Sequence, residues 1–155
     1  MKQLLLNFSM ILLCIAAINV NQAGATTCPQ ATTVSAIPYN ASLVCTGTND
    51  ITSTNATVCA PASSLYYGGQ EALLVYTPAA NVAVDISING QSWTGIMVYA
   101  GCPTSGGTCL GGISSSLIAK SLTNVALTGG TTYYIMVDTW PTPDSPCSGS
   151  GTTIS

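Results

Sequence analysis

The stretch at residues 122–138 restricts the fold of this chain more than any other. It has apolar residues at its start, a Gly129-Gly130 pair in its middle, and a run at 131–137 that is rich in β-branched and aromatic residues. This order indicates strand, turn and strand. Because a glycine pair supplies the positive φ angles of a short reversal, we expect a β-hairpin. A tyrosine at the start of the second strand can bond its hydroxyl back to the preceding corner, as in β-sandwich domains.

Other segments repeat the strand pattern. The clearest alternation runs over 81–90. Asp85 is expected to face solvent, and four apolar residues are expected to face the core: Val82, Val84, Ile86 and Ile88. We expect further strands at 33–37, 71–77, 95–99 and within 110–118, with a turn at 38–40. No segment has helical periodicity. The sequence therefore predicts an all-β fold, an antiparallel two-sheet sandwich of jelly-roll or immunoglobulin-like type, stapled by disulfides.

The N-terminal segment has the features of an export signal. Lys2 is followed by a largely apolar stretch at 4–18 and by the small-residue site Ala23-Gly24-Ala25. We predict a signal peptide at 1–25 and one domain at 26–155, secreted or at the cell surface, with no membrane span after cleavage. Because 151–155 begins a new alternation that stops, we expect the sequence to be truncated within a last strand and to come from a longer protein.

Charged residues are too few for several classes of function. The whole chain has two basic residues, five acidic residues and no histidine. Nucleic acid is excluded as a partner, because phosphate binding needs lysine and arginine. Catalytic triads that use histidine are excluded as well. Lys120 is interpreted as a solvated charge at a strand edge, and nothing places Asp85 and Asp138 at the separation of a glycosidase pair. We therefore predict that the chain is not an enzyme.

Cysteine usage agrees with export. Six cysteines remain after the signal peptide, and all six are disulfide candidates: Cys28, Cys45, Cys59, Cys102, Cys109 and Cys147. Cys102 and Cys109 enclose a short flexible loop, so we predict this local bridge first. Cys45–Cys59, which would close a polar loop, and Cys28–Cys147, which would tie the two ends together, follow. Structural zinc is disfavoured, because the chain has neither a Cys-x-x-Cys pair nor a histidine.

Two further sets of residues could bind ligands. Asn49, Asp50 and Glu71 offer the carboxylate and amide oxygens that Ca²⁺ prefers, and Asn49-Asp50 is otherwise an Asx-type turn that bonds its own backbone. Trp93 lies between two expected strands and Trp140 among prolines. On a rigid sandwich, loop tryptophans can stack on sugar rings. Packing in the core or at its rim is the favoured alternative, because the chain has few other large side chains.

The order of motifs resembles a known module. Its parts are Cys28-Pro29, Ile37-Pro38-Tyr39, Cys45-Thr-Gly-Thr-Asn49-Asp50, Cys59, Tyr67-Gly-Gly-Gln-Glu71, Val75-Tyr76-Thr77-Pro78, Gly95-Ile-Met-Val-Tyr99-Ala-Gly101-Cys102, Cys109 and the run at 127–138. This order is similar to the bacterial pre-peptidase C-terminal domain, a β-sandwich module of exported Bacteroidota proteins. Ala72 stands where that family usually has a second acid. The run at 127–137 is also similar to a fibronectin type III corner, but the cysteine pattern is foreign to that family.

The resemblance implies a non-catalytic accessory module of a secreted multidomain protein, for adhesion, spacing or substrate targeting. Its partners would be a neighbouring domain of a longer chain and an extracellular glycan or protein. The alternative is a carbohydrate-binding module that uses Trp93 and Trp140.

Overall fold

The protein is a sandwich of two β-sheets. The computed structural model describes residues 27–43, 48–141 and 150–155, so the predicted signal peptide lies outside the described residues. The strands are β1 (Thr32–Thr33), β2 (Tyr39–Leu43), β3 (Glu71–Tyr76), β4 (Val82–Asn89), β5 (Thr94–Ala100), β6 (Thr108–Ser115), β7 (Lys120–Leu127), β8 (Tyr133–Thr139) and β9 (Ser150–Ile154). Short 3₁₀ turns are η1 (Cys28–Gln30), η2 (Ser64–Tyr67) and η3 (Pro103–Ser105). No helix in the described ranges is long and apolar enough to cross a membrane.

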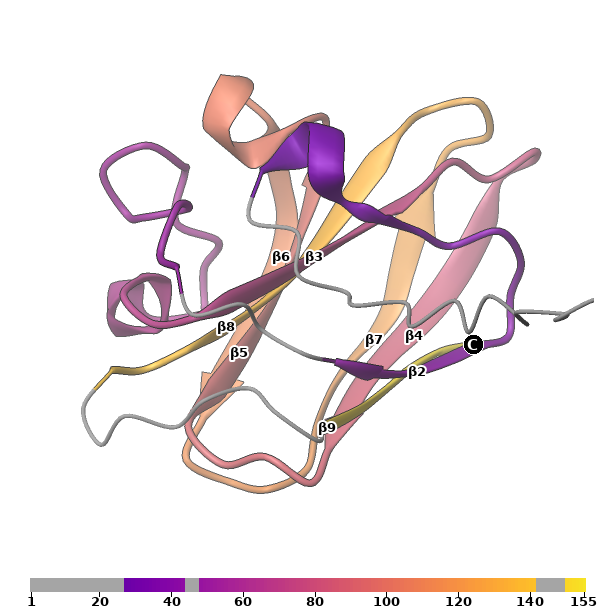
Figure 1. The fold of residues 1–155 in the computed structure, drawn as a ribbon. Coiled ribbons are helices and arrows are strands. Elements are labelled where there is room, and N and C mark those ends of the chain that lie inside the picture. Colours follow the sequence, from indigo (N-terminus) through magenta and orange to yellow (C-terminus); the bar gives the residue numbers. More distant parts are fainter. Residues whose placement is uncertain (1–26, 44–47, 142–149) are drawn as a thin grey trace, which may run out of the picture.

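The strands form a five-stranded sheet, β1-β3-β8-β5-β6, and a four-stranded sheet, β2-β9-β4-β7 (Figure 1). All pairs are antiparallel except β1 with β3. The predicted two-sheet sandwich is therefore confirmed. The expected turn at 38–40 is wrong, because Tyr39 and Asn40 already pair with β9. That strand supplies the hydrogen-bonding partner that a local reading of 38–40 cannot reveal.

The interior core lies between the two sheets. Alternate residues of β4 enter it as predicted: Val84, Ile86 and Ile88 are buried and Asp85 is exposed, whereas Val82, at the start of the strand, keeps 36% of its surface. From the other sheet, the core receives Ala72, Leu74, Ile96, Val98, Ile135 and Val137, among others. This core contains no charged side chain, so burial of apolar surface is what holds the two sheets together.

The predicted hairpin at 122–138 is wrong. β7 pairs with β4 in one sheet, whereas β8 pairs with β3 and β5 in the other. The glycine pair therefore turns a corner between the sheets. Gly130 has a φ of +78°, and a Cβ at Gly129 would lie 2.7 Å from the Cα of Ala80. The expected tyrosine bond is present, since the Thr128 amide donates to the Tyr133 hydroxyl at 2.7 Å. The glycine pair predicts that the chain reverses, but it does not indicate which sheet the next strand joins.

The outer face of the five-stranded sheet is covered as well. We call residues 48–67 the covering segment; Figure 1 shows it as purple loops on the side away from β2, β4, β7 and β9. The covering segment and the sheet together form an outer cluster of buried residues: Ile51, Cys59, Ala62, Tyr67, Leu73, Met97, Tyr99 and Met136. β3, β5 and β8 are thus buried on both faces, unlike β4, whose exposed and buried residues largely alternate.

Among the described residues, two disulfides join segments at the outer face, and neither has a predicted pairing. Cys28 is bonded to Cys102, with 5.8 Å between their Cα atoms, and Cys59 to Cys109, with 5.4 Å. The predicted bridges Cys102–Cys109, Cys45–Cys59 and Cys28–Cys147 are therefore wrong; Cys45 and Cys147 themselves lie outside the described residues.

The local bridge is unnecessary because the loop at 102–107 closes through its own backbone. The amides of Ser105 and Gly107 both donate to the Cys102 carbonyl, at 3.0 and 2.8 Å. Cys102, at the start of this loop, and Cys109, in β6, instead bond to cysteines that are 74 and 50 residues away in the sequence.

Candidate functional site

The structure brings the two tryptophans together. Trp93 lies in the loop between β4 and β5, and Trp140 follows β8 directly. Because β5 and β8 are neighbours with Thr94 opposite Thr139, the two indoles meet. Their ring centroids are 4.9 Å apart in an edge-to-face arrangement, and the Trp140 ring lies 5.8 Å from that of Tyr66 in η2. We call Tyr66, Trp93 and Trp140 the aromatic group.

Backbone geometry fixes the position of the aromatic group. The Trp140 amide donates to the Trp93 carbonyl at 3.0 Å, which ties the loop to the end of β8. Trp93 has a φ of +54°, in the left-handed region that bulky residues rarely adopt. Such strained conformations are concentrated at functional sites. Both indoles are half-buried, so part of each ring remains accessible to a ligand.

Lys120 supports the loop that carries Trp93. Its ammonium donates to the Gln91 carbonyl at 3.0 Å and to the Thr94 hydroxyl. The side chain is only 6% exposed, so the predicted solvated position is wrong. Burial lowers the pKa of Lys120 to about 8. The first residue of β7 lies opposite Ile88 near the end of β4, and this places Lys120 beside the loop that follows β4.

The predicted calcium ligands differ in burial and in hydrogen-bond partners. The Asn49 and Asp50 side chains are exposed, whereas Glu71 is fully buried. Asp50 and Glu71 do meet, but the Glu71 Oε1 atom accepts the backbone amides of Asp50 at 2.6 Å and Ile51 at 3.0 Å. These two amide bonds, which involve only one of the two Glu71 oxygens, connect the carboxyl with the loop at 49–51. In the described ranges, no three His, Cys, Asp or Glu side chains form a metal-binding group.

Glu71 instead faces a second acid. Glu71 of β3 lies opposite Asp138 of β8, and both side chains are 0% exposed. Burial raises the pKa of Glu71 to about 7. Burial, and then the charge of Glu71, raises the pKa of Asp138 to about 8. The sequence does not predict that these two acids meet, because the polar composition of residues 48–67 gives no sign that they bury this face of the sheet.

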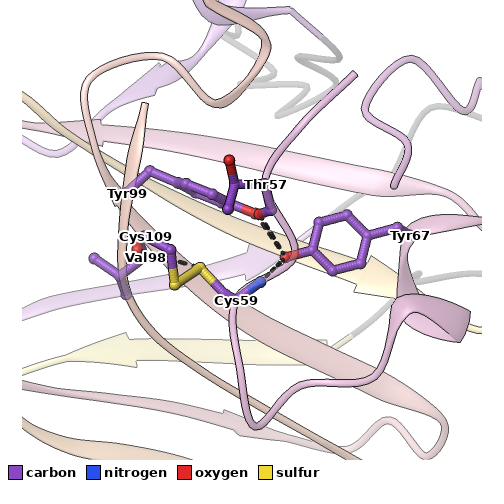
Figure 2. The surroundings of a disulfide bond; sticks show 6 residues. All are labelled: Thr57, Cys59, Tyr67, Val98, Tyr99 and Cys109. Atoms are coloured by element: carbon purple, nitrogen blue, oxygen red, sulfur yellow. Dashed lines mark hydrogen bonds between the residues drawn. A yellow bond between two sulfur atoms is a disulfide. The ribbon is translucent and has the colours of Figure 1, made fainter. Parts of the chain in front are cut away.

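Tyr67, at the end of the covering segment, and Tyr99 of β5 bond the backbone of that segment (Figure 2). The hydroxyls of Tyr67 and Tyr99 are 2.6 Å apart; that of Tyr99 donates to the Thr57 carbonyl at 2.7 Å, and that of Tyr67 accepts the Cys59 amide at 2.8 Å. The Cys59–Cys109 bridge lies beside these bonds. Covalent and hydrogen-bonded anchors therefore hold the same part of the segment.

The arrangement offers one accessible aromatic surface on strand ends, above a rigid and doubly covered sheet. Comparison of the chain with protein-family models, with curated proteins and with solved structures finds no match.

Proposed function

We propose that this chain is a non-catalytic accessory module of a secreted or cell-surface multidomain protein, similar to the bacterial pre-peptidase C-terminal domain, and that it serves adhesion, spacing or substrate targeting. The observation that carries the proposal is the aromatic group, a half-exposed tryptophan pair fixed by rigid strand ends. Binding residues presented by a rigid scaffold are typical of recognition modules.

The chemistry of the chain supports a binding role. Histidine is absent from the whole sequence. The buried acids Glu71 and Asp138 have no access to solvent, so a substrate cannot reach them. The two disulfides are compatible with an oxidising, extracellular location. Calcium at Asn49, Asp50 and Glu71 is left out of the proposal, because Glu71 is buried whereas the Asn49 and Asp50 side chains are exposed.

The second candidate is carbohydrate binding, and the tryptophan pair favours it. Sugar rings present C–H faces that stack on aromatic rings, and Trp and Tyr combine a large apolar surface with a polar group. With centroids 4.9 Å apart at an interplanar angle of 67°, the two indoles offer surfaces in two directions. The sugar would contact whichever ring faces are not covered by the neighbouring indole.

The test is glycan-array binding by the exported chain and by Trp93→Ala and Trp140→Ala variants. Leu117→Ala is the matched control, because Leu117 is an exposed apolar residue outside the aromatic group. Binding that both tryptophan variants lose and the control keeps would establish carbohydrate recognition. A blank array would leave adhesion or spacing. Hydrolytic activity that is abolished by Asp138→Asn would contradict the non-catalytic proposal.

The proposed partner is a neighbouring domain of a longer chain. The complete reading frame that encodes this sequence tests the point directly. A protease, adhesin or sorting domain in the same frame supports an accessory role, and a frame that encodes this domain alone contradicts it.

A further inference from the structure

In each of the Glu71 and Asp138 carboxyls, one oxygen accepts hydrogen bonds and the other has no hydrogen-bond partner. Glu71 Oε1 accepts two amides of the covering segment, and Asp138 accepts the Thr139 amide at 2.6 Å through Oδ1. The other oxygens, Glu71 Oε2 and Asp138 Oδ2, are buried and have no hydrogen-bond partner. A buried polar atom without a partner costs free energy, and two buried carboxylates on neighbouring strands also repel each other.

We propose that Glu71 and Asp138 form a proton-sharing pair, in which a proton on one carboxyl is donated to the free oxygen of the other, and that this proton keeps the covering segment seated on the sheet. One proton satisfies both leftover oxygens at once, because one becomes a donor and the other its acceptor. It also removes one of the two negative charges. Carboxyl pairs that share a proton are known wherever two acids face each other at close range.

Within the described part of the chain, no other group near the pair supplies a compensating charge. From the covering segment, Asp50 adds a further negative charge that disfavours ionisation of Glu71. From η2 and β5, Tyr67 and Tyr99 contribute hydroxyls whose pKa values burial raises, so they stay neutral. The β5 residue opposite Asp138 is Gly95, which has no side chain. The one basic residue among the described residues, Lys120, bonds to Gln91 and Thr94 instead.

The covering segment is the layer that keeps water from the pair. Glu71 holds that layer through the amides of Asp50 and Ile51, and these contacts are the direct link between the acids and the segment. When the last proton leaves, two buried charges require solvation that only water can provide. The segment must then lift near Asp50 and Ile51 to admit it.

The sign of the pH effect follows from the raised pKa values. In the unfolded chain, the two groups titrate near 4.5 and 3.8, whereas in the folded chain they titrate near 7 and 8. The pair's contribution to stability is therefore complete below about pH 4. It falls progressively as the pH rises above about 4, and it is fully lost once the pH has passed the folded-state pKa values of about 7 and 8. While the folded state holds at least one extra proton, the unfolding equilibrium constant should rise at least about tenfold per pH unit.

The test combines titration and unfolding on the disulfide-bonded chain. We expect a ¹³C NMR titration of the Asp138 carboxyl carbon to have its midpoint above pH 7. Between pH 5 and 7, the wild-type unfolding constant should rise by about a hundredfold or more. In the same range, the amides of Asp50 and Ile51 should lose protection from hydrogen exchange faster than the amides of β4.

Two isosteric variants isolate the pair. In Asp138→Asn, one titrating group is removed and a side-chain N–H takes the place of the shared proton, so the unfolding constant should rise less steeply with pH than in the wild type. Glu71→Gln should behave likewise. Asp85→Asn is the matched control, because Asp85 is an exposed acid that accepts the Asn124 amide at 2.7 Å. This control should keep the wild-type pH dependence.

Three outcomes would overturn the proposal. The first is an Asp138 midpoint near its usual value, a result that does not depend on whether any variant folds. The second is an unchanged pH dependence in both isosteric variants. The third is restoration of stability at pH 9 by added calcium but not by added magnesium, relative to chelator, because it would show that the two free oxygens hold a cation instead of a proton.

Discussion

The two buried regions of this protein are built in different ways. The interior core lies between the sheets, consists of apolar side chains and tyrosine, and is supplied by regular strands. The outer cluster lies between one sheet and the irregular covering segment. Buried hydroxyls, buried carboxyls and a disulfide accompany its apolar side chains. The two regions share β3, β5 and β8, whose opposite faces contribute to each.

The difference follows from backbone hydrogen bonding. Strands satisfy their own amides and carbonyls in the sheet, so the interior core needs only apolar side chains. The covering segment has no strand partner, and its buried groups must be bonded by side chains. Glu71 accepts from Asp50 and Ile51, whereas Tyr67 and Tyr99 bond Cys59 and Thr57. The outer cluster therefore contains buried polar side chains because the backbone of the irregular covering segment needs them as hydrogen-bond partners.

Among the variants that distinguish the two buried regions, removal of the Cys59–Cys109 bridge should cause the largest loss of stability. The bridge joins residues 50 apart, for which the chain-entropy model gives about 4 kcal/mol. The double variant Cys59→Ala/Cys109→Ala should lose about that much stability in urea unfolding. Hydrogen-exchange protection should fall in the covering segment, while the amides that pair β4 with β7 stay protected at low denaturant.

The same experiment can contradict the two-region description. Equal loss of protection in β4 and in the covering segment would show that the two regions unfold as one unit. Non-reducing peptide mapping of the unmodified chain provides the covalent control. It should recover Cys28 linked to Cys102 and Cys59 linked to Cys109, and a peptide that links Cys102 to Cys109 would refute the structure here.

The second largest loss of stability is expected when a side chain of the interior core is truncated. Ile86 is fully buried in β4 and faces the other sheet, so Ile86→Ala should cost about 3 kcal/mol in urea unfolding. Both regions should lose protection together, because the covering segment has no sheet to rest on once the sandwich opens. The control is Leu117→Ala: Leu117 is 67% exposed, and its truncation should change stability by less than about 0.5 kcal/mol. If the covering segment keeps its hydrogen-exchange protection in Ile86→Ala, the inference that this segment depends on the interior core is contradicted.

The sequence predicted the interior core because alternation in β4 shows one buried face. The outer cluster also left a signal. The apolar runs Ile96 to Tyr99 in β5 and Tyr133 to Val137 in β8 are continuous, and continuous runs are typical of strands buried on both faces. What no local pattern contains is the identity of the cover, since residues 48–67 have the polar composition of an ordinary loop.

The candidate site was predictable only in part. Trp93 and Trp140 were identified as loop aromatics, but their contact depends on β5 lying beside β8. Lys120 was misassigned because solvent exposure of a lysine is the usual case, and its burial results from partners on the 91–94 segment, far from it in sequence. The pairing of Glu71 with Asp138 depends on strand register and on the cover together, neither of which composition encodes.

The smallest expected effect compares one tyrosine hydroxyl in each region. The Tyr99 hydroxyl donates to Thr57 and contacts Tyr67 beneath the cover, whereas the Tyr133 hydroxyl accepts from Thr128, an exposed residue at the corner between the sheets. Tyr99→Phe leaves buried groups without a partner and should cost about 2 kcal/mol. Tyr133→Phe, the matched control, should cost only about 0.5 to 1 kcal/mol, because water can replace the lost acceptor. Urea unfolding of both variants measures the difference, and equal costs would mean that the outer cluster is as open to water as the corner.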